Sequence, residues 1–133
     1  MKTMAEERKT KGQIEADISE AIIKFEKEYM GRGPDETKTY LLDDLVVVRL
    51  QRVLTPAEQQ LAKATNDPNG RSLIKQVRTQ LLEKARPLLE PIVTDITGRA
   101  VRSLHTDIST VTGERIIVFT LDKGSVSGDT EPT

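Results

Sequence analysis

Residues 97–121 read TGRAVRSLHTDISTVTGERIIVFTL, and they match residues 30–50, MGRGPDETKTYLLDDLVVVRL, element by element. In each stretch a Gly-Arg or Gly-Arg-Gly sequence follows a helical pattern and precedes two β-rich runs that flank turn residues. Glycine commonly ends a helix in the left-handed conformation, and paired β-rich runs around a turn predict a hairpin. The two stretches therefore predict two copies of one helix–hairpin unit.

Each hairpin is preceded by the pattern of an amphipathic helix. Apolar residues recur at steps of three and four from Ile14 to Tyr29 and again from Ile74 to Ile96. In the second helix Pro87 and Pro91 each remove a backbone donor, so we expect a kink or a split near Arg86. The stripe that we expect this helix to bury consists of Ile74, Val77, Leu81, Ala85, Leu88, Ile92 and Ile96.

A short helix is expected between the two units. In Thr55-Pro56-Ala57-Glu58, threonine suits the N-cap and proline suits the first helical position. Glutamate three residues after the cap can accept a hydrogen bond from the cap's own amide, which completes a capping box. We expect the helix over residues 55–66, before a run of turn residues.

These elements predict an α+β fold in the order αββ-α-αββ, in which two hairpins form an antiparallel four-stranded sheet packed against helices. We expect one domain over residues 13–121, made of pseudo-repeats 13–53 and 71–121 and bridged by the helix at 55–66. Residues 1–12 are expected to be a flexible N-terminus, and the polar tail 122–133 is expected to be disordered. A chance likeness of two ordinary helix–hairpin units is the alternative to a true repeat.

Composition narrows the classes of function. The chain of 133 residues has no cysteine and one histidine, which excludes disulfides and thiolate nucleophiles and leaves a zinc site without ligands. Twenty basic residues against 21 acidic ones give a net charge of −1, which supplies no basic field for nucleic acid. The apolar runs are too short for membrane insertion, and MKTMAEERKTK lacks a signal-peptide segment. We therefore expect a cytoplasmic protein without cofactors or metals.

The strand expected at residues 45–50 has apolar residues on both faces. Side chains alternate along a strand, so Val46 and Val48 share one face while Leu45 and Val47 share the other. One layer of helices covers only one face of a sheet, so the second face needs another subunit or the kinked helix. We predict that a second copy covers it and that the protein is a homodimer.

Four motifs in order resemble the MpsC-like family of small bacterial proteins: KGQIEADISEAII (11–23), MGRGPDETKTYLLDDLVVVRL (30–50), LTPAEQQLA (54–62) and LHTDISTVTGERIIVFTL (104–121). The resemblance covers about residues 11–122. It implies a link to a proposed cation-translocating, membrane-potential-generating system. The other parts of that system resemble a respiratory-complex-like membrane subunit and a large partner linked to inorganic carbon uptake. The resemblance supplies no catalytic residues.

One candidate site lies on the first strand of the second hairpin. Strand alternation places Ser103, His105, Asp107 and Ser109 on one face. A catalytic triad would have to bend sharply around the imidazole, and no nucleophile-elbow motif accompanies these residues. We therefore interpret the row as a polar or interfacial strand face that can contact a partner, and we expect no catalytic residue.

The arginines of the two Gly-Arg motifs form a second candidate site. Arg32 and Arg99 follow helix-ending glycines, where a cation complements the negative end of the helix dipole. If the repeat is a pseudo-twofold, the two guanidinium groups could instead converge on one anion such as bicarbonate, phosphate or a carboxylate. Arg115, on the second strand of the same hairpin, completes the candidates for binding an anion or a partner.

Three functions remain open after these observations. The leading hypothesis is a non-enzymatic accessory or regulatory subunit of a membrane cation or bicarbonate transport system, which would reach the inner membrane through a transport-subunit partner. The second is a small-anion sensor that uses the arginines of the two Gly-Arg motifs. The weakest is a hydrolase that uses His105 with Asp107 and Ser109.

Overall fold

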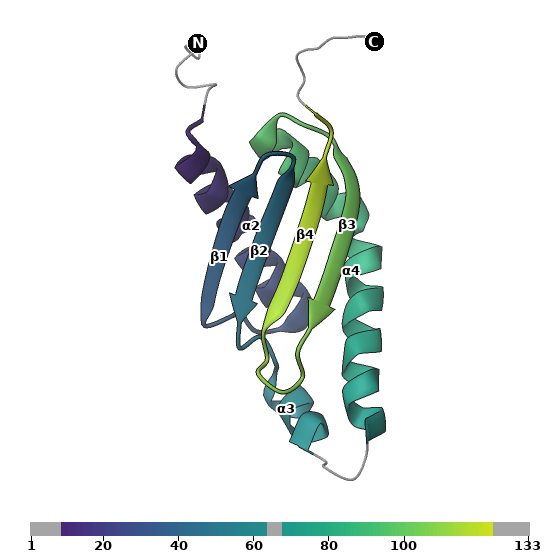
Figure 1. Cartoon of the computed structure of the whole chain (residues 1–133). Coiled ribbons are helices and arrows are strands. Elements are labelled where there is room, and N and C mark those ends of the chain that lie inside the picture. Colours follow the sequence, from purple (N-terminus) through teal and green to yellow (C-terminus); the bar gives the residue numbers. More distant parts are fainter. Residues whose placement is uncertain (1–8, 64–67, 124–133) are drawn as a thin grey trace.

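The computed structural model of the protein describes residues 9–63 and 68–123. Its helices and strands are α2 (Lys11–Met30), β1 (Glu36–Leu42), β2 (Leu45–Gln51), α3 (Pro56–Lys63), α4 (Pro68–Thr97), β3 (Val101–Ile108) and β4 (Arg115–Leu121) (Figure 1). The N-terminus predicted to be flexible lies outside the described residues up to residue 8, and so does the predicted tail from residue 124. The last part of the helix predicted at 55–66 falls in residues 64–67, which are also outside them.

The four strands form one antiparallel sheet in the order β1-β2-β4-β3. The second strands of the two hairpins, β2 and β4, pair with each other at the centre, so the first strands lie at the two edges. This confirms the predicted α+β class and the antiparallel four-stranded sheet. That the two halves descend from a duplication stays a prediction.

Glycine closes both long helices, as the Gly-Arg motifs predict. Gly31 has φ 80° and its amide donates to the Lys27 carbonyl. Gly98 has φ 74° and its amide donates to the Thr94 carbonyl. Both conformations are left-handed, which glycine adopts without the steric cost that a Cβ atom brings. Each helix therefore ends at a fixed residue and directs the chain into its hairpin.

The two long helices lie on the same side of the sheet (Figure 1). Helix α2 packs against β1, α4 packs against β3, and the two helices contact each other. Their apolar residues meet the inward side chains of the strands in one aliphatic core, while the opposite side of the sheet, called the outer face below, has no described helix over it (Figure 1). The core contains Ile18, Ile22, Phe25, Val46, Val48, Leu50, Val53, Leu54, Ile74, Leu82, Ala85, Leu89, Val93, Ile108, Ile117, Phe119 and Leu121.

The structure corrects the predicted split and the predicted buried stripe of the long helix. Helix α4 is continuous from Pro68 to Thr97, so Pro87 and Pro91 do not split it, while the alternative of a kink near Arg86 stays a prediction. Apolar packing on both sides of the prolines outweighs the lost backbone donors, since Ala85, Leu89 and Val93 are all buried. The buried stripe is also displaced from the predicted one: Val77, Leu88 and Ile92 are 43%, 57% and 40% exposed, and the buried positions are Ile74, Arg78, Leu82, Ala85, Leu89 and Val93.

The short helix α3 begins with the predicted capping box. The Thr55 amide donates to Glu58 Oε1 at 2.9 Å, and the Glu58 amide donates to Thr55 Oγ1 at 3.2 Å. Both unpaired amide groups at the start of the helix thereby gain acceptors. The box fixes the point at which the chain leaves the sheet and enters α3.

Thr55→Ala should lower the free energy of unfolding by about 0.5–2 kcal/mol, because it removes the cap and one half of the box. Glu58→Ala removes the other half, so the two losses should be coupled. Urea unfolding of both single variants and the double variant measures this coupling. If the two losses simply add, the box does not act as a reciprocal unit.

Candidate functional site

The polar row predicted on β3 lies on the outer face, along one edge of the sheet. His105 and Asp107 are exposed, whereas Ser103 is half-buried. Ser103 Oγ lies 3.3 Å from His105 Nε2. Opposite these residues on β4 are Thr120, Val118 and Ile116. The row is therefore an accessible strand edge beside apolar neighbours.

The same row does not form a catalytic triad in the described part of the chain. Asp107 Oδ1 accepts the Ile108 amide at 2.8 Å and pairs with Lys75 of α4 at 3.3 Å, and these contacts do not involve His105. The hydrogen bond from the Ile108 amide is the main cause that holds the pKa of Asp107 below its ordinary value. Burial opposes this shift, and the contact with Lys75 lowers the pKa further. Ser109 Oγ accepts the Thr112 amide within the β3–β4 turn. Serine, histidine and aspartate thus serve three separate local roles.

Arg32 and Arg99 do not converge on one anion. Arg32 donates to the Leu54 carbonyl at 2.7 Å, near the end of the sheet where β2 finishes. Arg99 donates to the Asp43 carbonyl at 3.1 Å, in the turn between β1 and β2 at the opposite end of those strands. Each guanidinium ties the residue after a helix to a neighbouring loop. The predicted convergence fails because the two helix ends lie at opposite ends of the sheet.

Arg115 lies inside the protein and cannot serve as a surface contact. Its side chain is 2% exposed, and Nη1 donates to Glu26 Oε2 at 2.8 Å. The other oxygen of Glu26 accepts from Arg78 Nη1 at 3.2 Å, so one fully buried carboxylate joins two buried arginines. Arg78 also makes a two-point contact with Glu58, at 2.8 and 2.7 Å. We call these four residues the buried charge network.

The remaining N–H donors of the buried charge network have acceptors on neighbouring residues. Arg78 Nη2 also donates to the Val53 carbonyl, and Arg115 Nε donates to Thr106 Oγ1. Burial would raise the pKa of Glu58, but the hydrogen bonds from Arg78 and from the Thr55 amide outweigh it and lower that pKa. Burial lowers the pKa of Arg115 against the attraction of Glu26. Two carboxylates balance two guanidinium groups, so the network carries no net charge into the core.

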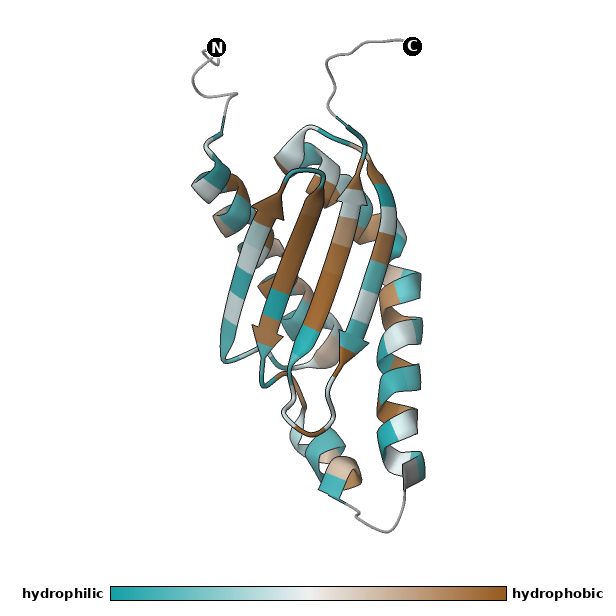
Figure 2. Cartoon of the chain, in the orientation of Figure 1, coloured by the Kyte–Doolittle hydropathy of each residue, from teal (hydrophilic) through white to brown (hydrophobic). Residues whose placement is uncertain are grey.

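The outer face of the sheet is a broad surface with an apolar centre that none of the described helices covers. The register aligns its side chains in rows across the four strands. One row runs Leu42, Leu45, Thr120 and Ser103, the next runs Tyr40, Val47, Val118 and His105, and the third runs Lys38, Arg49, Ile116 and Asp107. The central strands β2 and β4 are the most hydrophobic in Figure 2, and the edge strands are more polar. The face therefore has an apolar middle and a polar border.

Charged groups gather at one end of the outer face. Lys38, Arg49 and Asp107 occupy the third row, and Arg49 is paired with Glu114. This pair raises the pKa of Arg49, mainly through the hydrogen bond that Arg49 Nε donates to Glu114. An apolar centre with charges at its border is the usual composition of a protein–protein interface. The alternation of side chains in the sequence predicted that Leu45 and Val47 share this face. The strand register now shows which residues of β1, β3 and β4 lie beside them.

A second apolar surface runs along α4. Leu73, Val77, Leu88 and Ile92 are 48%, 43%, 57% and 40% exposed. These residues lie close to whole numbers of helical turns apart, so their side chains form one ridge on the side of α4 that does not face the core. This ridge is narrower than the outer face, because one helix contributes all of it. It serves below as the comparison surface.

A family model described as "Na+-translocating membrane potential-generating system (MpsC)" matches residues 10–123. This match spans both hairpins and all three described helices. The chain belongs to the MpsC family. Two Bacillus subtilis (strain 168) proteins are similar to this MpsC-family chain. The uncharacterized protein YbcI is 44% identical over 114 residues, which are 86% of this chain and 90% of YbcI. The uncharacterized protein YrhF is 26% identical over 108 residues, which are 80% of this chain and 86% of YrhF.

No solved structure shows significant similarity to this MpsC-family chain. Among residues 9–63 and 68–123, none of the helices is long and apolar enough to cross a membrane. The same residues contain no group of three histidine, aspartate or glutamate side chains placed to hold a metal ion.

Glu26→Gln should be strongly destabilising in this MpsC-family chain, because it leaves two buried arginines with one carboxylate between them. Breaking a buried ion pair typically costs about 3–5 kcal/mol. Glu20→Gln is the matched control, since Glu20 is exposed on the same helix, and its effect should stay within about 0.5 kcal/mol. Urea unfolding followed by circular dichroism measures both. Equal small losses would mean that the network does not hold the helices to the sheet.

Proposed function

We propose that this chain is a non-enzymatic, cytoplasmic accessory subunit of a Na+-translocating, membrane-potential-generating system and that it works as a homodimer assembled through the outer face. The family match supports the link to such a system. The observation that carries the proposal is the broad apolar sheet face that the described helices leave uncovered. The separate roles of Ser109, His105 and Asp107 favour a binding function over hydrolysis.

A second copy suits the outer face because the sheet order is symmetric. Two sheets that pack face to face keep their strands roughly aligned. A twofold axis along the strands, midway between β2 and β4, brings β1 of one copy over β3 of the other. Val47 then lies over Val118 of the other copy, at the apolar centre of the interface. The same patch meets itself, as a twofold interface requires.

This arrangement also matches charges at the border. Lys38 and Asp107 stand in the same row at opposite edges of the sheet. The twofold axis therefore brings Lys38 of each copy over Asp107 of the other, which gives two symmetric pairs of opposite charge. Tyr40 and His105 share the next row, so the phenol of one copy approaches the imidazole of the other. Turning one copy end over end would instead place Lys38 over Leu42, which matches neither charge nor hydropathy.

Light scattering of the purified protein at micromolar concentration should give about twice the 14.8 kDa chain mass. Val47→Glu should give the mass of one chain, because it buries a charge at the centre of the interface. Leu88→Glu places the same charge on the α4 ridge and should leave the dimer intact. A monomeric wild type would contradict the dimer, and dissociation by Leu88→Glu in place of Val47→Glu would move the interface to α4.

The same variants test the accessory role in cells. Cells that lack the gene are given a plasmid that encodes wild type, Leu88→Glu or Val47→Glu. A voltage-sensitive dye then reports their membrane potential after a sodium pulse. Wild type and Leu88→Glu should restore the sodium-dependent part of the potential, whereas Val47→Glu should not. An unchanged potential in cells without the gene would contradict the link to the transport system. Full restoration by a monomeric Val47→Glu protein would contradict the requirement for the dimer.

A further inference from the structure

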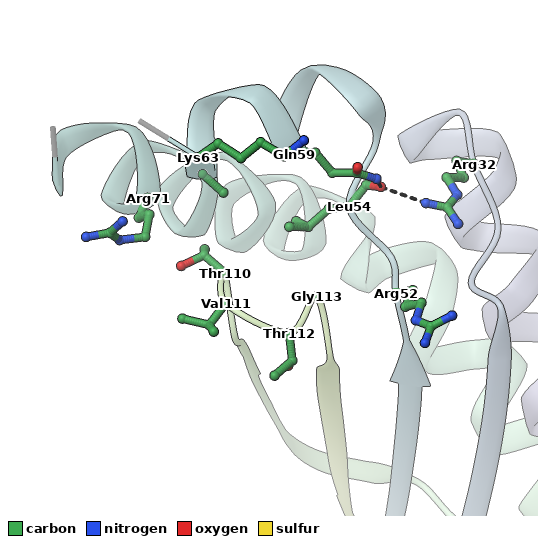
Figure 3. A pocket seen from close by; sticks show the side chains of 11 residues that line it. Arg32, Arg52, Leu54, Gln59, Lys63, Arg71, Thr110, Val111, Thr112 and Gly113 are labelled. Carbon is green, nitrogen blue, oxygen red and sulfur yellow. Dashed lines mark hydrogen bonds between the residues drawn. The ribbon is translucent and has the colours of Figure 1, made fainter. Parts of the chain in front are cut away.

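A cavity of about 490 Å³ lies between α3 and the turn that joins β3 to β4 (Figure 3). Its walls come from four parts of the chain: the residue after the α2 cap, the segment that follows β2, helix α3 with the start of α4, and the β3–β4 turn. The volume falls within the range of about 300–1,000 Å³ that is common for small-molecule sites. It lies away from the polar row on the middle of β3.

The charged side chains that line this cavity are all cationic among the described residues. They are Arg32, Arg52, Lys63 and Arg71. The protein as a whole has a net charge of −1, so four cations without an acid in one lining are a local departure from its balanced composition. Asp35, outside the lining, pairs with Arg32 at 2.9 Å and more weakly with Arg52 at 3.4 Å. One carboxylate therefore offsets only part of the positive charge.

The cations stand at different places around the rim of the cavity, and the guanidinium groups of Arg71 and Arg52 extend away from the β3–β4 turn (Figure 3). In Figure 3, Arg71 lies at one end, Arg32 and Arg52 lie at the other, and the Lys63 side chain extends along α3 between them. Within the described part of the chain, neither Lys63 nor Arg71 is paired with another side chain. Arg32 is already directed by its bond to the Leu54 carbonyl, which also accepts from Gln59. Arg32 is thus held in place, whereas Arg52, Lys63 and Arg71 remain available to a ligand.

The cavity floor is built from unusual backbone. Arg52 has φ 56°, a left-handed conformation that non-glycine residues rarely adopt. Gly113 has φ 78°, and a Cβ atom there would lie 3.3 Å from the Arg52 Cα atom. The Val53 amide donates to the Gly113 carbonyl at 2.9 Å, which holds the two segments together. Conformations of this kind are concentrated at ligand sites, where the surrounding structure maintains them.

We propose that this cavity binds a small phosphate-bearing molecule, with its phosphoryl groups held by Arg32, Arg52, Lys63 and Arg71. Guanidinium groups match the oxygens of a phosphoryl group with two parallel hydrogen bonds, and lysine adds a mobile point charge. A ligand that satisfies several cations must itself carry several negative charges, which favours a phosphate ester or diphosphate over a single carboxylate. Leu54, Ala62 and Val111 supply apolar contacts for an organic part.

The proposal retains one residue of the predicted anion site and replaces the other. Arg32 lines the cavity, while Arg99 is bound to carbonyls of Asp43 and Asp122 far along the sheet. Arg52, Lys63 and Arg71 take its place, because α3 and the β3–β4 turn bring them to the same end as Arg32. The site is separate from the outer face, so its test does not depend on the dimer.

Isothermal titration with inorganic pyrophosphate and with ATP, at constant ionic strength, tests the site directly. Both probes should bind wild type with saturable heat. The double variant Lys63→Gln, Arg71→Gln should weaken binding at least about tenfold, the change expected for losing charge-assisted hydrogen bonds. The control Lys84→Gln, Arg102→Gln removes one lysine and one arginine outside the cavity and should bind as wild type does. Circular dichroism verifies that all variants fold.

A second variant separates binding from stability. Asparagine tolerates the left-handed conformation better than arginine does, so Arg52→Asn should keep the melting temperature of wild type or raise it while weakening pyrophosphate binding. A flotation assay distinguishes the source of the phosphoryl group: vesicles that contain phosphatidic acid, whose headgroup is a phosphate monoester, are compared with vesicles of phosphatidylcholine. Flotation that is lost in the Lys63→Gln, Arg71→Gln variant would support the same site with a lipid headgroup as the ligand.

Two results would overturn the proposal. One is the absence of binding by pyrophosphate, ATP and vesicles that contain phosphatidic acid to folded wild-type protein. The other is equal weakening in the cavity variant and in the Lys84→Gln, Arg102→Gln control, which would show general charge attraction in place of a site. Light scattering on the same samples reports the dimer independently, so either proposal can fail without the other.

Discussion

The contact between Glu26 and two arginines is the constraint on which the rest of the structure depends. The Glu26 carboxylate has no exposed surface and accepts hydrogen bonds from Arg78 of α4 and Arg115 of β4. Arg78 also donates hydrogen bonds to Glu58 of α3. Taking these charges out of water costs several kcal/mol for each ion, so they are tolerated only when every one is paired. That condition is met only when α2, α3, α4 and the sheet occupy their observed places together. We infer that the need to pair every charge makes the network favour this one arrangement of the helices.

This arrangement has a direct consequence for the sheet. The inward side chain of Arg115 draws α2 and α4 to the same side of β4, so the outer face keeps its apolar rows without a described helix over them. Val47 and Val118 lie next to each other at the centre of that face. The position of α3 follows from the same network, because Glu58 both caps the helix and binds Arg78. The cationic cavity under α3 therefore depends on the network as well.

Local rules predicted much of the fold from the sequence. The two helix-ending glycines, the hairpin turn at Asp43 and the capping box at Thr55 each depend on a few neighbouring residues, and the structure contains all of them. The alternation of Leu45 and Val47 against Val46 and Val48 also identified the two faces of the sheet correctly. These features need no knowledge of distant partners, which is why a single sequence is sufficient.

The features that sequence reasoning missed all depend on distant partners. Arg78 occupies a core position of α4, but a charged residue normally indicates the solvent side, so the predicted stripe shifted onto Val77 and Leu88. Glu26 follows Ile22 by one helical turn on the buried face of α2, a signal that could have indicated a buried carboxylate. The convergence of Arg32 and Arg99 was predicted from the likeness of the two Gly-Arg motifs, but the two helices end at opposite ends of the sheet. The cavity that contains Arg32 is formed with α3, which has no counterpart in the other half.

The central claim is that the outer faces of two copies meet, and thiol cross-linking can test it because the chain has no cysteine of its own. In a Lys38→Cys, Asp107→Cys variant the two substituted positions lie on opposite edge strands, three strand spacings or about 14 Å apart within one chain, but they face each other across the proposed interface. Facing sheets lie about 10 Å apart, beyond the roughly 7 Å that a disulfide allows between Cα atoms, so the cross-linker is a bis-maleimide whose spacer is about as long as that gap. It should give a covalent dimer with unchanged circular dichroism. A folded dimer by light scattering that stays uncross-linked would contradict the face-to-face arrangement.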